Sequence, residues 1–403
     1  MISQKIWRLG NLSYLYEDSA HYSIRPMTVN TTSGELCPVP YQNEFVFVSN
    51  RKETDLFEKV NGKLNTPFYQ LYIASKKKDT TKQVSFAQPK GFARTLKSKF
   101  NIGPVDFYDK GKRMVFVSSS EKTSDGGRRL GLYFASLVDH SWKLDYSYPF
   151  NGDDYSIHDV SINEDGNVIY FSSDMKGGVG GKDIYTSTRT NDKWSKPINI
   201  GEPVNTTEDE AFPALQGSTL YFSSDGHPGL GALDIFKVRI TKEGYDEVEN
   251  IGYPMNSSYD DFGLKFDSVD VHGYLTSNRK HGGYDDDVYE FDMDMQTYPF
   301  IISGIMQYKE HTLSDQSEIK IWPNTKIFLV DSEKNLHVYE TTTDTNGGFS
   351  LTIPYFSKYY IKVDDLSGNE YKASLELQKY RVENSVHQIV VVKNIFNPSS
   401  ESK

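Results

Sequence analysis

Cysteine is nearly absent from this chain, with Cys37 the only one among its 403 residues. No internal disulfide can therefore form, which excludes the small folds that disulfides hold together. Long apolar runs are missing too, because no stretch reaches the 18 consecutive apolar residues that a membrane-spanning helix requires. Tryptophan is scarce, with four residues, and few long segments repeat apolar residues at the helical period of 3.6. These absences disfavour a helical protein.

Positive charge is also in short supply. The chain has 44 lysine and arginine residues against 55 aspartate and glutamate residues, which gives a formal net charge of −11. Because non-specific binding to nucleic acids or anionic lipids relies on basic patches, we expect neither kind of partner. The first residues contain no basic segment followed by an apolar one, so we expect no signal peptide in this sequence.

Tyrosine and phenylalanine are abundant, with 28 and 23 residues. These aromatic residues favour half-buried β-strands, so the composition predicts a mostly β protein. One motif also recurs at a fixed spacing in the middle of the chain. Phe-Ser-Ser-Asp stands at residues 171–174 and again at 222–225, 51 residues further on.

A motif of Asp, then Ile or Val, then an aromatic residue follows each copy of this repeat. Its aspartates, Asp183 and Asp234, are also 51 residues apart, and a third copy brings Asp287 after another 53 residues. Repeats of this length that contain several short β-rich runs indicate a β-propeller. In the unit that contains Asp234 we predict four strands, near residues 211–214, 220–223, 233–238 and 250–252. One such sheet cannot bury both of its faces, so neighbouring sheets must stack around an axis.

Five units of this kind can be counted, near residues 35–75, 104–150, 155–206, 209–257 and 259–291. The last unit has no outer strand of its own after Phe291. Residues 22–29, followed by Asn30 and Thr31, resemble the closing strand of a repeat, so we predict that they close the ring and cover its open edge. A six-bladed ring is the alternative if residues 1–22 and the connector 76–100 form another sheet. We assign the propeller to residues 1–298.

The sequence pattern changes after residue 298. Asp344, Asn346, Gly347 and Phe349 form an Asp-x-Asn-Gly-x-Phe motif between two strand-like runs, which is typical of a hairpin turn followed by a core aromatic residue. We therefore predict a small all-β sandwich at residues 299–394, followed by a polar tail at residues 395–403.

The repeats resemble the WD40-like propeller repeats of the PorE-like family, periplasmic proteins of bacteria with a type IX secretion system. The resemblance is carried by residues 171–174, 222–231, 260–263 and 273–279. Residues 299–394 resemble a carboxypeptidase-regulatory-like domain, through residues 323–330 and 344–349. The resemblance implies association with the outer membrane from the periplasmic side, and partners among secretion-system or outer-membrane proteins.

Family members also carry a lipoprotein cysteine and helical repeats before the propeller, and an OmpA-like peptidoglycan-binding domain after the sandwich. This sequence has none of these, so the resemblance implies a link to peptidoglycan only within a longer parent protein. Whether an anchor or further domains have been removed stays open.

The repeated aspartates Asp183, Asp234 and Asp287 allow two interpretations. They can cap a turn through backbone N–H groups, which the repetition favours, or they can bind calcium, with Asp285, Asp286 and Asp287 the best candidates. The glycine-rich residues 177–182 do not have phosphate-loop spacing and precede a strand, so we predict a hairpin turn there. We expect no cofactor.

No catalytic motif stands out, so we expect a non-enzymatic scaffold that binds protein partners through loops on one propeller face. The long insertions at residues 53–67, 76–98 and 121–129 place this surface over the first two units. Phe57, Phe68, Tyr69 and Arg128 are the contact candidates. The alternative is a carbohydrate- or peptidoglycan-processing enzyme, which a cleft of converging carboxylates on the ring axis would favour.

Overall fold

The computed structural model describes residues 12–17, 19–52, 60–61, 66–77, 85–96, 100–119, 126–267, 271–283, 285–293, 300–310, 319–332, 334–354, 357–364, 370–375 and 386–393. The chain divides into two compact units, Met1–Met293 and Asp294–Lys403. Across these described ranges no helix is long and apolar enough to cross a membrane.

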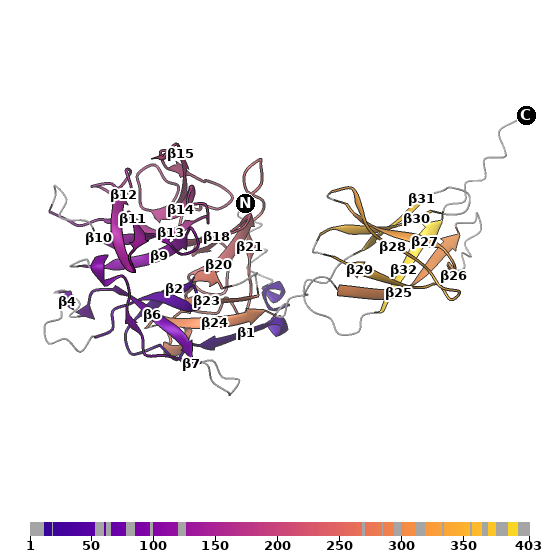
Figure 1. Cartoon of the computed structure of the whole chain (residues 1–403), viewed down its shortest axis with the longest axis horizontal. Helices are drawn as coiled ribbons and strands as arrows, with labels where there is room; N and C mark the ends of the chain where they lie inside the picture. The colour runs from indigo at the N-terminus through magenta and orange to yellow at the C-terminus, as the bar shows by residue number, and fades with distance from the viewer. Residues whose placement is uncertain are drawn as a thin grey trace, which may run out of the picture. The chain divides into compact units, whose positions relative to one another are not determined.

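The first unit is a β-propeller of five sheets (Figure 1). Blade one contains β2 (Glu35–Tyr41), β3 (Glu44–Ser49), β6 (Gln70–Lys77) and the short outer strands β7 (Ser85–Phe86) and β8 (Lys90–Gly91). Blade two contains β9 (Ile102–Tyr108), β10 (Arg113–Ser119), β11 (Leu130–Val138) and β12 (Ser141–Ser147). Blade three contains β13 (Ile157–Ile162), β14 (Val168–Ser173), β15 (Asp183–Thr190), β16 (Lys193–Trp194) and β17 (Ile198–Asn199).

Blade four contains β18 (Glu210–Gln216), β19 (Thr219–Ser224), β20 (Asp234–Arg239) and β21 (Glu249–Asn250). Blade five contains β22 (Asp261–Phe266), β23 (His272–Ser277), β24 (Asp287–Met293) and β1 (Tyr22–Pro26). The 3-10 turns η1 (Ser13–Tyr16) and η2 (Ser19–His21) precede β1 in the sequence. A small hairpin of β4 (Val60–Asn61) and β5 (Thr66–Pro67) and the 3-10 turns η3 (Arg94–Leu96) and η4 (Arg279–His281) lie between the blade strands.

The innermost strands β2, β9, β13, β18 and β22 contact one another in that order, and β22 contacts β2 again. The described residues therefore form a closed ring of five blades, and the six-bladed alternative is not realised. The second strand of a blade is apolar on both faces, because neighbouring blades cover both sides of it. In β3, for example, Phe45, Val46, Phe47 and Val48 are each at most 1% exposed.

The predicted closure of the ring by the N-terminal strand is confirmed. β1 pairs antiparallel with β24, with Tyr22 opposite Met293 and Pro26 opposite Tyr289. Just beyond β1, the Asn30 side chain donates to the Val288 carbonyl oxygen (2.9 Å) and accepts from the Val288 N–H (3.0 Å). Blade five thus joins the two ends of the propeller and has no open edge here.

The same asparagine contact recurs in three further blades. Each asparagine side chain bonds both the N–H and the C=O of one residue in the third strand, as the backbone of an outer strand would. The pairs are Asn151 with Leu132, Asn205 with Ile184 and Asn256 with Ile235.

The glycine-rich residues 177–182 form the predicted turn before β15. A Cβ atom on Gly180 would lie 2.6 Å from the Thr206 carbonyl oxygen, so no larger residue fits this close approach. The Asp183 carboxylate accepts the N–H groups of Val179 (2.7 Å) and Gly180 (3.2 Å), and Asp234 likewise accepts the Gly231 N–H (2.9 Å). The turn-capping role predicted for these two aspartates is confirmed.

The second unit is a sandwich of two sheets. One sheet has the order β26 (Ile319–Ile321), β25 (Phe300–Glu310) and β29 (Gly348–Ile353), with β32 (Val386–Lys393) parallel to β25. The other has the order β28 (Leu336–Thr342), β27 (Lys326–Asp331), β30 (Tyr359–Asp364) and β31 (Glu370–Leu375). Met306, Ile327, Leu351 and Ile361 are fully buried in its core. The predicted all-β fold, a propeller followed by a sandwich, is confirmed.

Candidate functional site

The innermost strands of the propeller each shift register once, through a bulge near the middle of the strand. At this bulge Cys37, Phe212 and Gly263 adopt the left-handed conformation, with φ between 51° and 64°. A bulge bends the strand and re-aims its side chains. Residues on either side of it line the space along the ring axis.

Three polar side chains from different blades meet on this axis. Lys265 of β22 places its Nζ atom 2.7 Å from the Asp106 Oδ2 of β9 and donates to the Ser161 Oγ of β13 (3.1 Å). The Ser161 hydroxyl donates to the same Asp106 oxygen at 2.9 Å. Lys265 thus reaches from blade five to blades two and three, neither of which is its neighbour in the ring.

Backbone groups complete this network. The Ile162 N–H donates to Asp106 Oδ2 (3.1 Å), and the Leu215 N–H donates to Ser161 Oγ (3.0 Å), which adds blade four. The Lys265 and Asp106 side chains are 16% and 11% exposed. The two side chains of such a buried pair stay together, because their separation would leave each charge buried without compensation.

A cavity of about 450 Å³ opens beside this pair, and both Asp106 and Lys265 line it. The turn that follows β13 contributes two more carboxylates, Glu164 and Asp165, together with Asn163. One Glu164 oxygen accepts the Lys110 N–H at 2.5 Å, which ties this turn to blade two. The volume lies within the range of small-molecule binding pockets.

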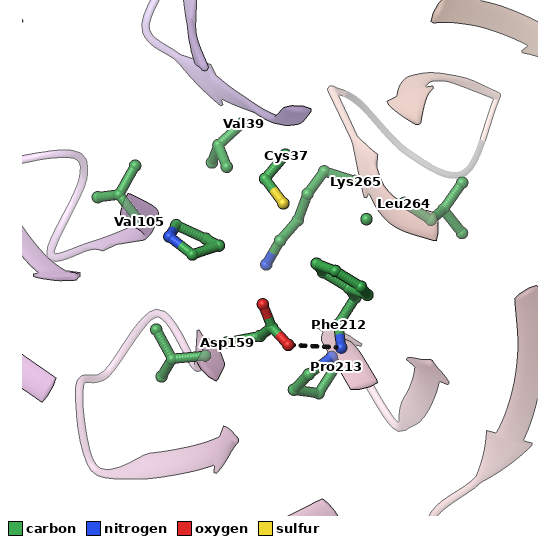
Figure 2. Close-up of a pocket in the computed structure, with 11 residues that line it drawn as sticks. Cys37, Val39, Val105, Asp159, Phe212, Pro213, Leu264 and Lys265 are labelled. Atoms are coloured by element: carbon green, nitrogen blue, oxygen red, sulfur yellow. Dashed lines mark hydrogen bonds between the residues drawn. The ribbon is translucent and has the colours of Figure 1, made fainter. Parts of the chain in front are cut away.

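A second carboxyl group lies in a smaller cavity on the axis. Asp159 of β13 is buried and accepts hydrogen bonds from the Ser172 hydroxyl (2.7 Å) and the Phe212 N–H (3.3 Å). Its burial raises the pKa of this carboxyl above the ordinary value, despite the hydrogen bond from Ser172. Figure 2 shows Asp159, Lys265 and Cys37 around a common space. This cavity of about 20 Å³ has room for a water molecule.

The axis therefore holds two carboxyl groups in unlike environments. Asp106 is compensated by the ammonium group of Lys265, whereas burial favours the protonated form of Asp159. Pairs of carboxyl groups whose surroundings differ in this way can divide the roles of proton donor and charge-stabilising carboxylate. The site has the elements of general acid–base chemistry.

The predicted partner-binding residues lie elsewhere. Phe68 packs edge-on against Phe100 with ring centroids 5.5 Å apart, and the Arg128 guanidinium lies 3.5 Å from the centroid of Phe100. The Tyr69 hydroxyl lies against Gly34, where a Cβ atom would be 2.8 Å from it. Phe57 falls outside the described residues. Phe68 and Tyr69 are half-buried and Arg128 is exposed, and none of the three lines the axial cavities. Their role in partner binding stays a prediction.

The calcium candidates lie at the start of β24. Asp287 is fully buried, with Lys280 Nζ 3.7 Å from its Oδ2 atom. Burial raises the pKa of Asp286 to about 6, and the negative charges of Asp260, Asp285 and Asp287 add to the rise. Within the described part of the chain, no three His, Cys, Asp or Glu side chains are grouped so that they could hold a metal ion.

The axial residues Asp106, Asp159 and Lys265 were not predicted from the sequence. A signal for two of them exists in the repeats once the inner strands are aligned. The fifth residue of these strands is Val39, Asp106, Ser161, Ala214 and Lys265, so two charged residues occupy a position that is otherwise small or apolar.

No family model and no curated protein matches the chain. Solved structures with similarity include the RS223 β-xylosidase, with 10% identity and a TM-score of 0.42, over 69% of this chain and 96% of that chain. The exo-β-1,3-galactanase 1,3Gal43A from Clostridium thermocellum has 12% identity and a TM-score of 0.39, over 88% of this chain and 83% of that chain. The GH43 β-xylosidase/α-arabinofuranosidase CoXyl43 from a compost metagenome has 9% identity and a TM-score of 0.40, over 66% and 93%.

These comparisons correct two expectations. Membership of the PorE-like family of type IX secretion proteins was wrong, because no family model matches and the similar structures are glycoside hydrolases. The expectation of a non-enzymatic secretion-system scaffold was wrong for the same reason, and the predicted partners stay a prediction. At such low identity and TM-scores these likenesses assign no substrate to this chain.

Proposed function

We propose that the protein processes a carbohydrate at the propeller axis, by cleavage of a glycosidic bond. The observation that carries this proposal is that Lys265 lines two axial cavities, each with a carboxyl group in an unlike environment: Asp106 in the pocket of about 450 Å³ and Asp159 in the cavity of about 20 Å³. Glycoside hydrolysis commonly uses two carboxyl groups, of which the acid has a raised pKa. Carboxylate, amide and ammonium groups in the pocket also suit the hydroxyl groups of a sugar.

In the proposed reaction Asp159 gives its proton to the glycosidic oxygen as the bond from this oxygen to the anomeric carbon breaks. A water molecule in the small cavity next to Asp159 relays this proton. Asp106 stabilises the positive charge that develops on the sugar ring. A second water molecule then adds to the anomeric carbon, and its proton returns to the Asp159 carboxylate. Lys265 holds Asp106 in place across the axis.

The test is hydrolysis of xylan, arabinan and β-1,3-galactan, polymers suggested by the names of the glycosidases above, measured as release of reducing sugar. Asp159→Asn and Asp106→Asn should each lower the rate by about 10²-fold or more. Asp192, which is 92% exposed on the turn after β15 and does not line the pocket, provides the matched control, because Asp192→Asn should leave the rate within about twofold. Thermal melting identifies any variant that fails to fold.

Two results would contradict the proposal. One is the absence of reducing sugar from every polymer together with the absence of binding of their oligosaccharides in calorimetry. The other is full activity in Asp159→Asn, which would remove the proposed proton donor.

A further inference from the structure

A second pocket, of about 390 Å³, lies between blades one and two, away from the axis. Three segments form it: the turn that follows β2, the residues around η3, and the hairpin turn between β11 and β12. The sequence predicted that the long insertion at residues 76–98 belongs to a partner-binding surface. In the structure, residues 91–95 of this insertion form one wall of the pocket.

Aromatic rings form the apolar side of this pocket. Tyr41, Phe92 and Trp142 pack together, with centroid distances of 5.4 Å between Tyr41 and Phe92 and 5.9 Å between Phe92 and Trp142. Tyr41 is 7% and Trp142 5% exposed, so the rings are held firmly by their neighbours. Such a wall presents a rigid surface to the face or edge of a ligand ring.

Polar groups surround this wall. The Arg94 guanidinium lies over the backbone of Gly91, where any side chain would collide with it. The hydroxyl of Thr95, the next residue, donates to the Trp142 carbonyl oxygen at 2.5 Å, which fixes the arginine-bearing segment to blade two. His140 is presented by the β11–β12 turn, with a left-handed φ of 60°.

The charge of this pocket is opposite to that of the axial pocket. None of the eleven described residues that line it is aspartate or glutamate, whereas Arg94 carries a positive charge. The axial pocket has three carboxylates and one lysine. Asp139 precedes His140 in the turn and Glu44 lies near Tyr41, but neither lines the pocket. In a chain of net charge −11, such a site favours an anion.

We propose that this interblade pocket binds a small carboxylate that carries a compact ring with an apolar face. The Arg94 guanidinium can bind the carboxylate through two parallel hydrogen bonds, and the ring lies against Trp142 and Phe92. A sugar acid and an aromatic acid share this chemistry. The pocket lies apart from the axis, so ligand binding here does not depend on the proposed glycosidase activity.

Calorimetric titration of the full chain with glucuronate and with phenylacetate tests this inference, with glucose and 2-phenylethanol as their neutral counterparts. At least one carboxylate should bind at least tenfold more tightly than its neutral counterpart. Arg94→Gln should weaken that binding at least tenfold. Arg239→Gln provides the matched control, because Arg239 is an exposed arginine on blade four and its substitution should leave the affinity unchanged.

The two carboxylates distinguish the possible ligands. Binding of glucuronate alone assigns the pocket to sugar acids, and binding of phenylacetate alone assigns it to aromatic acids. Asp106→Asn should abolish the axial chemistry and leave this affinity unchanged, so the two proposals can fail separately. The inference is overturned if neither carboxylate binds, or if a folded Arg94→Gln protein binds as tightly as the wild type.

Discussion

Blades four and five use the same buried carboxylate position in different ways. Glu210 opens the innermost strand of blade four, and Asp261 opens that of blade five. Both are fully buried, and both accept a hydrogen bond from the backbone N–H of the residue four positions earlier, Thr206 (2.7 Å) or Ser257 (2.6 Å). The hydrogen-bonded frame is therefore the same in the two blades.

The charge balance is not the same. In blade five Arg279 pairs with Asp261 and also donates to the carbonyl oxygens of Pro254 and Met255. In blade four the corresponding residue is Gly226, where a Cβ atom would collide with the Thr206 hydroxyl. The two blades thus share the backbone hydrogen bond to the buried carboxylate, but only blade five has an arginine that balances its charge.

The difference appears in the acidity of the two groups. Burial raises the pKa of both carboxyls, but Arg279 opposes the rise at Asp261. Burial raises the pKa of Glu210 to about 7, hydrogen bonds from Thr206 and Ser224 oppose the rise, and the negative charge of Asp183 adds to it. Blade four therefore contains a buried acid that titrates near neutral pH, where blade five contains an ion pair.

The largest effect on blade five is expected from removal of its outer strand β1, which comes from the N-terminal end of the propeller. The outer strand of blade four, in contrast, belongs to the same continuous segment as its other strands. Deletion of residues 1–31 removes β1 and the Asn30 contact and exposes the edge of β24. We expect loss of cooperative thermal melting, followed by aggregation. Circular dichroism and light scattering provide the measurement. Deletion of residues 397–403 serves as a control, and an unchanged melting curve after the N-terminal deletion would contradict this closure.

Removal of Arg279 from blade five should lower the stability of the protein more than removal of an arginine from blade four. Arg279→Met leaves Asp261 buried without its cation, which should cost about 3–5 kcal/mol in the free energy of unfolding. Urea denaturation at pH 7 measures this change. Arg239→Met, at an exposed position of blade four, should change stability by less than about 0.5 kcal/mol. Equal losses of stability in the two variants would show that the buried ion pair contributes no more to stability than an exposed arginine does.

Glu210 should give blade four a pH dependence of its own. Because its folded-state pKa of about 7 exceeds the ordinary value of 4.5, the folded state binds the proton more tightly. The resulting stability is fully present below about pH 4.5 and is lost as the pH rises to about 7, with a total change of about 3 kcal/mol. Glu210→Gln should therefore be the more stable protein at pH 8, but not at pH 4.5.

The measurement is the difference in unfolding free energy between Glu210→Gln and the wild type as a function of pH. Taking this difference cancels the titration of other buried acids such as Asp234, whose pKa burial also raises to about 7. Glu243→Gln, on the exposed turn after β20, should show no such trend. A difference for Glu210→Gln that stays constant with pH would disprove the titration.

The blade pattern could be predicted because each blade repeats local interactions. The strand after Ser218, the turn before Asp234 and the asparagine contact are set by residues within one unit, so they appear as a sequence period. The closing strand was predictable for the same reason, because Asn30 and Thr31 stand where Asn205 and Thr206 stand in another unit. The sandwich followed from the turn at Asn346 and Gly347.

The axial site could not be predicted in this way. Asp106 and Lys265 are 159 residues apart and become neighbours only when the ring closes around its axis. The interblade pocket has the same origin, since Tyr41 and Trp142 belong to different blades. The partner surface predicted over the insertions of blades one and two stays a prediction; Phe68, one of its candidates, packs against Phe100.

The asparagine contact provides the finest comparison of the two blades. Asn256 bonds Ile235 within a continuous segment of blade four, and Asn30 makes the matching contact to Val288 from the other end of the propeller. Substitution by alanine leaves one N–H and one C=O without this partner, so each variant should lose about 1–3 kcal/mol of stability. Urea denaturation of the two variants should give equal losses if the contact alone matters. A clearly larger loss for Asn30→Ala would mean that the same contact also holds the closing strand in place, and would distinguish blade five from blade four by connectivity as well as by charge.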